Sequence, residues 1–411
     1  MSHLGQCHTG PVKSTRRGFL QSAGLTGLGA SGLGASALAA GSLAAGAGPA
    51  AAATTAASGV VPFYGPHQAG IATPSQNYLQ FAALDVIGNS VADLRALLKI
   101  WTEAAARMTR GEAIGAMRTG SRPPVDTGEA VGHGPNQLTV TFGFGPTLFG
   151  TKEKDRFGLA KHRPAPLVDL PRFTGDEIQA SISGGDLGIQ VCANDPQVAF
   201  HAVHDLIKQG ISIAQPKWLL AGFGRTANSF EQALPRNLMG FQDGTANIMG
   251  EDDAAMDDFV WAAEPASPPW MRGGSYLVAR RIKLALGLWD GTSLNGQEKA
   301  IGRTKLGGDE LFNMPATAHI LLASPQRNHG QQIMRRGYSY VDGVDSVTGD
   351  AAAGVMFLVY QADPRRQFIP IQRRLAGRDG LSAFVTHIGS SIFACPPGVK
   401  SGGYIGQQLL A

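Results

Sequence analysis

The sequence predicts an α+β fold built from two halves, each with the strand–helix–strand–strand–helix–strand order of a ferredoxin-like domain. Two observations predict it. Segments with two-residue and 3.6-residue hydrophobic periods follow this order over residues 78–218, and a similar order recurs over residues 275–375. No sequence repeat accompanies the shared order. We therefore expect duplicated ferredoxin-like domains, whose antiparallel sheets and helices form a dimeric α+β barrel-like arrangement.

The length and composition fit this plan. A chain of 411 residues with 43% hydrophobic residues is long enough for two or three domains with sizeable cores. We expect a leader over residues 1–57, an N-terminal ferredoxin-like domain over residues 58–230 and a C-terminal one over residues 231–411.

The N-terminal half contains the clearest helical signal. A helix expected over Ser90–Arg107 places Leu94, Leu97, Leu98 and Trp101 on one face. A second helix is expected to start in the segment Asn194-Asp195-Pro196-Gln197 and to run to about Lys208. Strands are expected over Tyr78–Val86, Leu138–Phe144, Ser181–Val191 and Ile211–Trp218.

The C-terminal half has apolar runs of strand length between shorter helical segments. The expected strands are Ser275–Leu284, His319–Ala323, Ile333–Tyr340 and Gly354–Gln361, and the expected helices are Ser293–Arg303 and Arg366–Leu375.

The first 57 residues have the pattern of an export signal. They contain no acidic residue, and Arg16-Arg17-Gly18-Phe19-Leu20 precedes a mildly apolar stretch rich in Ala and Gly. This is typical of a substrate of the twin-arginine export machinery, which carries folded proteins. The recurring glycines and serines make a poor membrane anchor, so we expect no stable membrane span after cleavage. The mature protein is expected in the periplasm, in the cell envelope or outside the cell.

Charge and cysteine content narrow the function further. The 35 basic and 31 acidic residues include Lys13, Arg16 and Arg17 of the leader, so the mature chain is near neutral and has no electrostatic basis for binding nucleic acid. Outside the leader only Cys192 and Cys395 remain, each in an apolar run. We expect two buried free thiols, although the sequence also permits one disulfide.

The segment from Asn237 to Asn247 contains the first candidate site residue. Asp243 lies between Gly240 and Gly244, on a loop whose glycines let a flat ligand approach the main chain closely. An isolated Asp-Gly is most often a turn, and that interpretation stays open here.

A second candidate segment follows about 75 residues later. His319 lies in an apolar run, where it is either a core histidine or a neutral imidazole ligand for iron. Arg335 follows an Ile-Met pair, and a partly buried guanidinium needs an anionic partner. His329 lies in a polar turn that suits a buried ligand less well. His201 and His204 could form a surface metal pair, but we expect them to be solvated helix residues.

Taken together, these motifs resemble the dye-decolorising peroxidase family, in particular its exported subgroup with twin-arginine signals. The resemblance extends from about Tyr78 to the end of the sequence. It rests on the Gly240–Gly244 motif with Asn247, on Ala318-His319-Ile320 and on Ile333-Met334-Arg335-Arg336-Gly337-Tyr338. Further matching segments are residues 139–145, 273–278, 363–368 and 393–398.

The resemblance implies one haem b per chain in the C-terminal half and a peroxidase that uses hydrogen peroxide to oxidise dyes and phenolic compounds. His319 matches the proximal iron ligand, Asp243 and Arg335 the distal acid–base pair, and Asn247 a distal asparagine. Phe357 is expected to help form the wall of the haem pocket. Bulky reductants would pass electrons through surface aromatic residues, for which the candidates are Trp218, Trp261, Trp270, Trp289, Tyr338 and Tyr340, although most of these are expected to be packing residues.

The sequence departs from the family pattern at two places. The segment between Arg303 and His319 is shorter than in most relatives, which is expected to alter access to the haem. Ala383 lies where relatives often have a carboxylate, so another residue, for which Asp379 is a candidate, must orient the proximal histidine.

Three other functions remain open from the sequence. Some relatives release iron from haem as deferrochelatases. A non-catalytic haem carrier of the cell envelope would not need the pair of Asp243 and Arg335. A haem-free interaction protein is the remaining alternative. The sequence leaves the physiological reductant and homo-oligomer formation undetermined.

Overall fold

A computed structural model describes residues 59–117, 120–151 and 154–411, so the predicted leader with its twin arginine and Cys7 lies outside the described residues. In the N-terminal half, four strands and two helices have the predicted order. They are β1 (Tyr78–Val86), α2 (Val91–Met108), β2 (Thr139–Phe144), β3 (Leu187–Ala193), α3 (Pro196–Gly210) and β4 (Ala214–Phe223).

Local sequence explains where the two long helices begin. The Ser90 hydroxyl accepts a hydrogen bond from the Asp93 backbone N–H, which caps α2. The Asp195 carboxylate accepts bonds from the backbone N–H groups of Gln197 and Val198, and Pro196 occupies the first turn of α3. The expected strand over Ser181–Val191 begins only at Leu187, because Gly184 and Gly185 take positive φ angles before it.

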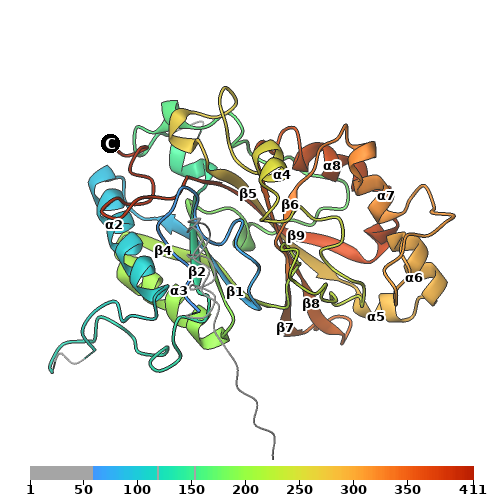
Figure 1. Ribbon diagram of the computed structural model, residues 1–411, viewed down its shortest axis with the longest axis horizontal. Helices are drawn as coiled ribbons and strands as arrows, with labels where there is room; N and C mark the ends of the chain where they lie inside the picture. The colour runs from blue at the N-terminus through green and yellow to red at the C-terminus, as the bar shows by residue number, and fades with distance from the viewer. Residues whose placement is uncertain (1–58, 118–119, 152–153) are drawn as a thin grey trace, which may run out of the picture. The chain divides into compact units, whose positions relative to one another are not determined.

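The C-terminal half repeats this order with more short helices. Its elements are α4 (Asp253–Phe259), β5 (Ser275–Leu284), α5 (Leu286–Asp290), α6 (Leu294–Ile301), α7 (His319–Ala323), β6 (Met334–Arg335), β7 (Tyr338–Val344), β8 (Ala351–Gln361), α8 (Phe368–Leu375) and β9 (Val385–Cys395). In Figure 1, α2 and α3 lie beside the strands of the first half, and α5 to α8 lie beside those of the second.

Two expected strands of this half differ in the structure. The run His319–Ala323 is helix α7. At its C-terminal end the Asn328 side-chain amide donates to the carbonyls of Leu322 and Ser324, so these groups need no strand partner. Such short apolar runs do not distinguish strand from helix by their period. The run Ile333–Tyr340 is split into β6 and β7 at Gly337, whose carbonyl accepts from the Thr226 backbone N–H and whose N–H donates to the Thr226 hydroxyl.

Strand pairing confirms the duplicated ferredoxin-like fold. The first half has the strand order β2-β3-β1-β4, and the corresponding strands of the second half have the same order, β7-β8-β5-β9. Every pairing is antiparallel. The halves join at two seams, where Phe144 pairs with Ala394 and Phe223 pairs with Ser339. Because β5 also pairs with β8, the joined sheets close into a barrel-like ring.

Successive side chains along each strand point alternately to the inside of this ring and to its outer layer. In β1, Leu79 and Phe81 belong to a core that also contains Trp218, Tyr338 and Phe393, while Ala82 and Leu84 pack in another core together with residues of α2 and α3. Cys192 and Cys395 lie in the inner core as buried free thiols, so the expectation of unpaired cysteines is confirmed for the described residues.

The last described residues pack on the first half. The Ile405 backbone N–H donates to the Thr102 hydroxyl of α2 at 3.0 Å, and the Arg95 guanidinium donates to the Leu410 carbonyl. Leu409 and Leu410 are buried there. Among the described residues, no helix is both long and apolar enough to cross a membrane.

Candidate active site

Asp243 is presented by a tight loop after Arg236. The Asn237 side-chain oxygen accepts bonds from the backbone N–H groups of Met239 and Phe241, and the Asp243 N–H donates to the Pro235 carbonyl. Gly244 has a φ of 105°, and a Cβ there would lie 2.7 Å from the Ala227 carbonyl oxygen. The glycine is therefore required by the close approach of two backbone segments.

Gly240 is favoured mainly by its positive φ, because the Lys305 side chain that a Cβ would meet is flexible. Its φ is 84°, and a Cβ would lie 2.6 Å from the Lys305 side chain. The structure thus explains both glycines by backbone conformation and packing within the protein. Their predicted contact with a cofactor stays a prediction.

Arg335, in β6, reaches Asp243 across 92 residues of sequence. Its Nη1 donates to Asp243 Oδ1 at 3.2 Å, and its Nη2 donates to the Thr245 carbonyl at 2.9 Å. The side chains of Asp243 and Arg335 are 19% and 28% exposed, so both remain accessible to a small molecule. The two residues predicted as a pair therefore form one in the structure.

Asn247 connects the Asp243 loop to β6. Its Nδ2 donates to the carbonyls of Ala227 and Arg335, and its Oδ1 accepts from the Arg335 backbone N–H at 2.8 Å. Both ends of the amide are engaged with the main chain, so its structural effect is to position Arg335.

His319 is the first residue of α7, and a carboxylate contacts the Nδ1 atom of its ring. Asp379 Oδ2 lies 2.6 Å from His319 Nδ1, and its Oδ1 accepts from the Leu381 backbone N–H. The Asp379 side chain is 7% exposed and that of His319 is 36% exposed. With Nδ1 committed to Asp379, the Nε2 atom is left to bind a metal ion. The structure thus places Asp379 in contact with His319, and its role as a substitute for the carboxylate expected near Ala383 stays a prediction.

The residues that follow His319 in α7, Ile320 to Ala323, are apolar but are not fully buried. Phe357 in β8 is also partly exposed, on the same strand face as Val355. Ile320 and Val355 pack against the apolar cluster that contains Phe241 of the Asp243 loop. The loop and α7 thus contribute side chains to the same apolar cluster.

Family models match nearly all of the described chain. Residues 68–224 match Dyp-type peroxidase, N-terminal, and residues 234–400 match Dyp-type peroxidase, C-terminal. The chain belongs to the Dyp-type peroxidase family. Its members are peroxidases, a class of oxidoreductase.

Similar proteins cover most of the chain. A deferrochelatase of Escherichia coli O157:H7 is 36% identical over 373 residues, which is 85% of this chain and 87% of that protein. Ferric DtpA from Streptomyces lividans is 38% identical with a TM-score of 0.78, over 89% of this chain and 100% of that one. A DyP-type peroxidase from Streptomyces coelicolor has 38% identity and a TM-score of 0.77, with the same coverage.

In this Dyp-type peroxidase, the structure also contains a group of buried polar side chains that the sequence did not reveal. The Arg280 guanidinium is fully buried, pairs with Asp176 and donates to His387 Nδ1 at 3.2 Å. Burial and the positive charge of Arg280 together lower the pKa of His387 to about 3, although the negative charge of Asp379 opposes the shift. The sequence signal for this group of residues is Arg280, an arginine that follows an apolar run in β5.

Most of the candidate electron-transfer aromatics pack inside the protein. Trp218, Trp270, Trp289, Tyr338 and Tyr340 are buried, and Trp261 is partly exposed and stacks on His67 with ring centroids 3.8 Å apart. This agrees with the expectation that most of them are packing residues.

The other candidate histidines do not contact His319 or Asp243. His329 is exposed in a turn with a φ of 55°. His201 is buried, so the expectation of a solvated helix residue is wrong for it. Carboxylates of the segment before β2 cover this face of α3.

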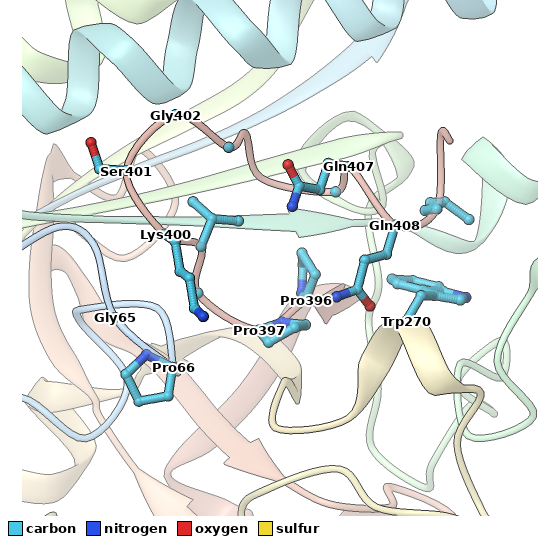
Figure 2. A pocket seen from close by; sticks show the side chains of 15 residues that line it. Gly65, Pro66, Trp270, Pro396, Pro397, Lys400, Ser401, Gly402, Gln407 and Gln408 are labelled. Atoms are coloured by element: carbon cyan, nitrogen blue, oxygen red, sulfur yellow. The ribbon is translucent and has the colours of Figure 1, made fainter.

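A cavity of about 690 Å³ lies elsewhere, along the segment that follows β9. Figure 2 shows Lys400 and Gln408 pointing toward Pro397, with Trp270 beside them. Trp270, one of the candidate aromatic residues, lines this cavity, whereas Asp243, Arg335 and His319 do not.

Proposed function

We propose that the protein is an exported haem peroxidase, which uses hydrogen peroxide to oxidise organic reductants such as dyes and phenolic compounds. The observation that carries the proposal is a pair of polar arrangements on segments whose apolar residues Phe241 and Ile320 belong to one cluster. One is the accessible Asp243–Arg335 pair, and the other is His319 with its Nδ1 bound to a buried carboxylate.

The residues fit one haem b per chain. His319 Nε2 is the free nitrogen of an imidazole whose other nitrogen is fixed, as is usual for a histidine that binds iron. The partly exposed apolar residues of α7 and Phe357 offer a surface for a flat apolar ring. When bound, the haem would supply the iron centre at which peroxide is reduced and a reductant is oxidised.

The acid–base work falls to Asp243. Its Oδ1 is engaged by Arg335, whereas Oδ2 makes no hydrogen bond within the described residues. Oδ2 would take the proton from one oxygen of hydrogen peroxide and return it to the other, which leaves as water. The Arg335 guanidinium would stabilise negative charge on the departing oxygen. Asn247 would hold Arg335 in place through its backbone.

The absorption spectrum of the purified mature protein, before and after one equivalent of peroxide, tests this proposal. We expect a Soret band that shifts or bleaches with peroxide, followed by recovery when a phenolic reductant is added. No Soret band after haem is supplied would contradict the proposal, and a band indifferent to peroxide would contradict peroxidase activity.

A second candidate function is release of iron from haem, favoured by the relatives named deferrochelatase. Anaerobic incubation with haem distinguishes the two by product. A deferrochelatase yields free protoporphyrin, and a peroxidase yields oxidised dye only when peroxide is present. A non-catalytic carrier would show neither product.

Export is supported by the arginine pair alone. Replacement of Arg16 and Arg17 by lysine is expected to retain the precursor in the cytoplasm, whereas unchanged export would contradict the twin-arginine route.

A further inference from the structure

A second cluster of potential metal ligands lies in the N-terminal half. His201 and Asp205 are one turn apart on α3, and Asp126 comes from the segment between α2 and β2. Their side chains are 6%, 0% and 2% exposed. This cluster shares no residue with the proposed haem site.

His201 is oriented by a carboxylate on one side of its ring. Its Nδ1 lies 2.9 Å from Glu129 Oε2, so the neutral ring carries its proton on Nδ1. The Nε2 lone pair then faces Asp205 Oδ2 at 3.5 Å and Asp126 Oδ2 at 3.8 Å, and neither contact is a hydrogen bond. Three electron-rich atoms thus converge on one point.

Asp205 provides an independent observation, because one of its carboxylate oxygens lacks a hydrogen-bond partner. Its Oδ1 accepts a bond from the Thr127 backbone N–H, but its Oδ2 is buried and has no hydrogen-bond partner among the described residues. An unpaired buried carboxylate oxygen is costly, since it gives up water without compensation. A cation between Asp205 and His201 would supply the missing partner.

We propose that Asp126, His201 and Asp205 bind one divalent transition-metal cation of the zinc or manganese class. The three ligand atoms lie within 4.8 Å of one another. Ligand bonds of about 2.1 Å in a tetrahedral site would place ligand atoms about 3.4 Å apart, close to the distances at Nε2. One imidazole and two carboxylates suit such a cation, and the two aspartates neutralise its charge.

Glu129 completes the arrangement from outside the ligand set. Its contact with His201 Nδ1 is the carboxylate–histidine–metal pattern that fixes ring orientation. A doubly protonated His201 is the competing explanation. It would place an N–H toward the two aspartates at distances well beyond the roughly 2.8 Å of a charge-assisted hydrogen bond.

The ion would have a structural effect, because its ligands join two separate parts of the chain. Asp126 belongs to a long connection between α2 and β2, which runs beside α3 in Figure 1, and His201 and Asp205 belong to α3 itself. Binding would tie this connection to the helix.

Metal content of the untagged, haem-loaded protein tests the proposal. After dialysis against a chelator, the protein is incubated with zinc or manganese chloride, desalted and measured by elemental analysis, with haem iron counted separately. We expect about one added ion per chain for at least one of the two metals. At a free-metal concentration of one hundred times Kd, Tm should rise by about 4 °C.

Asp205→Asn and His201→Gln remove ligand atoms, and each should weaken metal binding at least tenfold. His204→Gln is the matched control, because His204 lies on the same helix and contacts Glu129 without facing the three ligand atoms. It should keep the ion. Wild-type protein that takes up neither metal overturns the proposal. Equal binding by both ligand variants, or equal loss in the control, would also overturn it.

Discussion

Asn247 and Arg335 exchange hydrogen bonds in both directions: the Arg335 backbone N–H donates to Asn247 Oδ1 at 2.8 Å, and Asn247 Nδ2 donates to the Arg335 carbonyl at 2.9 Å. The Asn247 side chain thereby makes, to the backbone of Arg335 in β6, the two hydrogen bonds that a neighbouring strand would make. The guanidinium of Arg335 is then aimed back at the same loop, where it meets Asp243.

Asn247→Ala should slow the reaction with peroxide by about tenfold, less than loss of Asp243 itself, because it loosens Arg335 without removing a reacting group. Stopped-flow absorbance measures the rate. A loss as large as that of Asp243→Ala would mean that Asn247 contacts the reactants directly.

Asp243→Ala and Arg335→Leu should each reduce the same rate by roughly 10²-fold or more, the scale of general acid–base catalysis. Asp169→Asn serves as the control, since the Asp169 side chain is 83% exposed and lies outside the site. Haem content should be equal in all variants. Wild-type rates in both site variants would remove the pair from the mechanism.

Asp379→Asn should weaken haem retention by about 10-fold to 100-fold and raise the iron reduction potential, because the neutral amide makes His319 a poorer donor. Haem transfer to an acceptor protein and a redox titration measure these two effects. A variant with unchanged potential and unchanged haem loss would show that the contact does not tune the histidine.

Gly244→Ala should lower the free energy of unfolding by about 1–3 kcal/mol, because it adds a backbone clash to an unfavourable positive φ. Gly402→Ala is the matched control, since its φ is 86° and no atom lies within 4 Å of the added Cβ. Urea denaturation measures both. Equal losses would mean that the close approach to Ala227 costs nothing.

His387 should make the fold sensitive to mild acid. Its pKa is about 3 in the folded protein, so the unfolded chain binds the proton first as the pH falls below about 6.5, and stability is lost from there toward pH 3. When the pH falls from 7 to 5, the free energy of unfolding of His387→Gln should decrease by about 1–2 kcal/mol less than that of the wild type.

Urea denaturation at the two pH values gives this difference, and His162→Gln provides an exposed control. If both variants lose as much stability as wild type, His387 is not the group responsible.

The sequence contained enough information to predict that Asp243 and Arg335 pair and to predict most strands. Asp243 and Arg335 were found because motif order places them, and the long strands β1 and β5 because their hydrophobic pattern is uninterrupted. Helix α7 was mistaken for a strand because five apolar residues fit either element.

Other features depend on register, which no local pattern encodes. Arg280 meets His387 only because β5 and β9 pair antiparallel with a bulge after Arg281. Strand β9 itself was not predicted, since its glycine, serines and histidine hide the alternation. His201 was expected on the surface because the connection that covers it has no regular structure of its own.

The packing of Ile405 and Leu410 on helix α2 has a consequence for biosynthesis. These contacts span 303 and 315 residues. A ribosome therefore releases the helix long before it releases the segment that covers it. The first half cannot complete its core while the chain is still growing, although N-terminal domains commonly fold during translation. The core of the first half is complete only after residues 405–410 have been synthesised, and until then the face of α2 that they cover is available to chaperones.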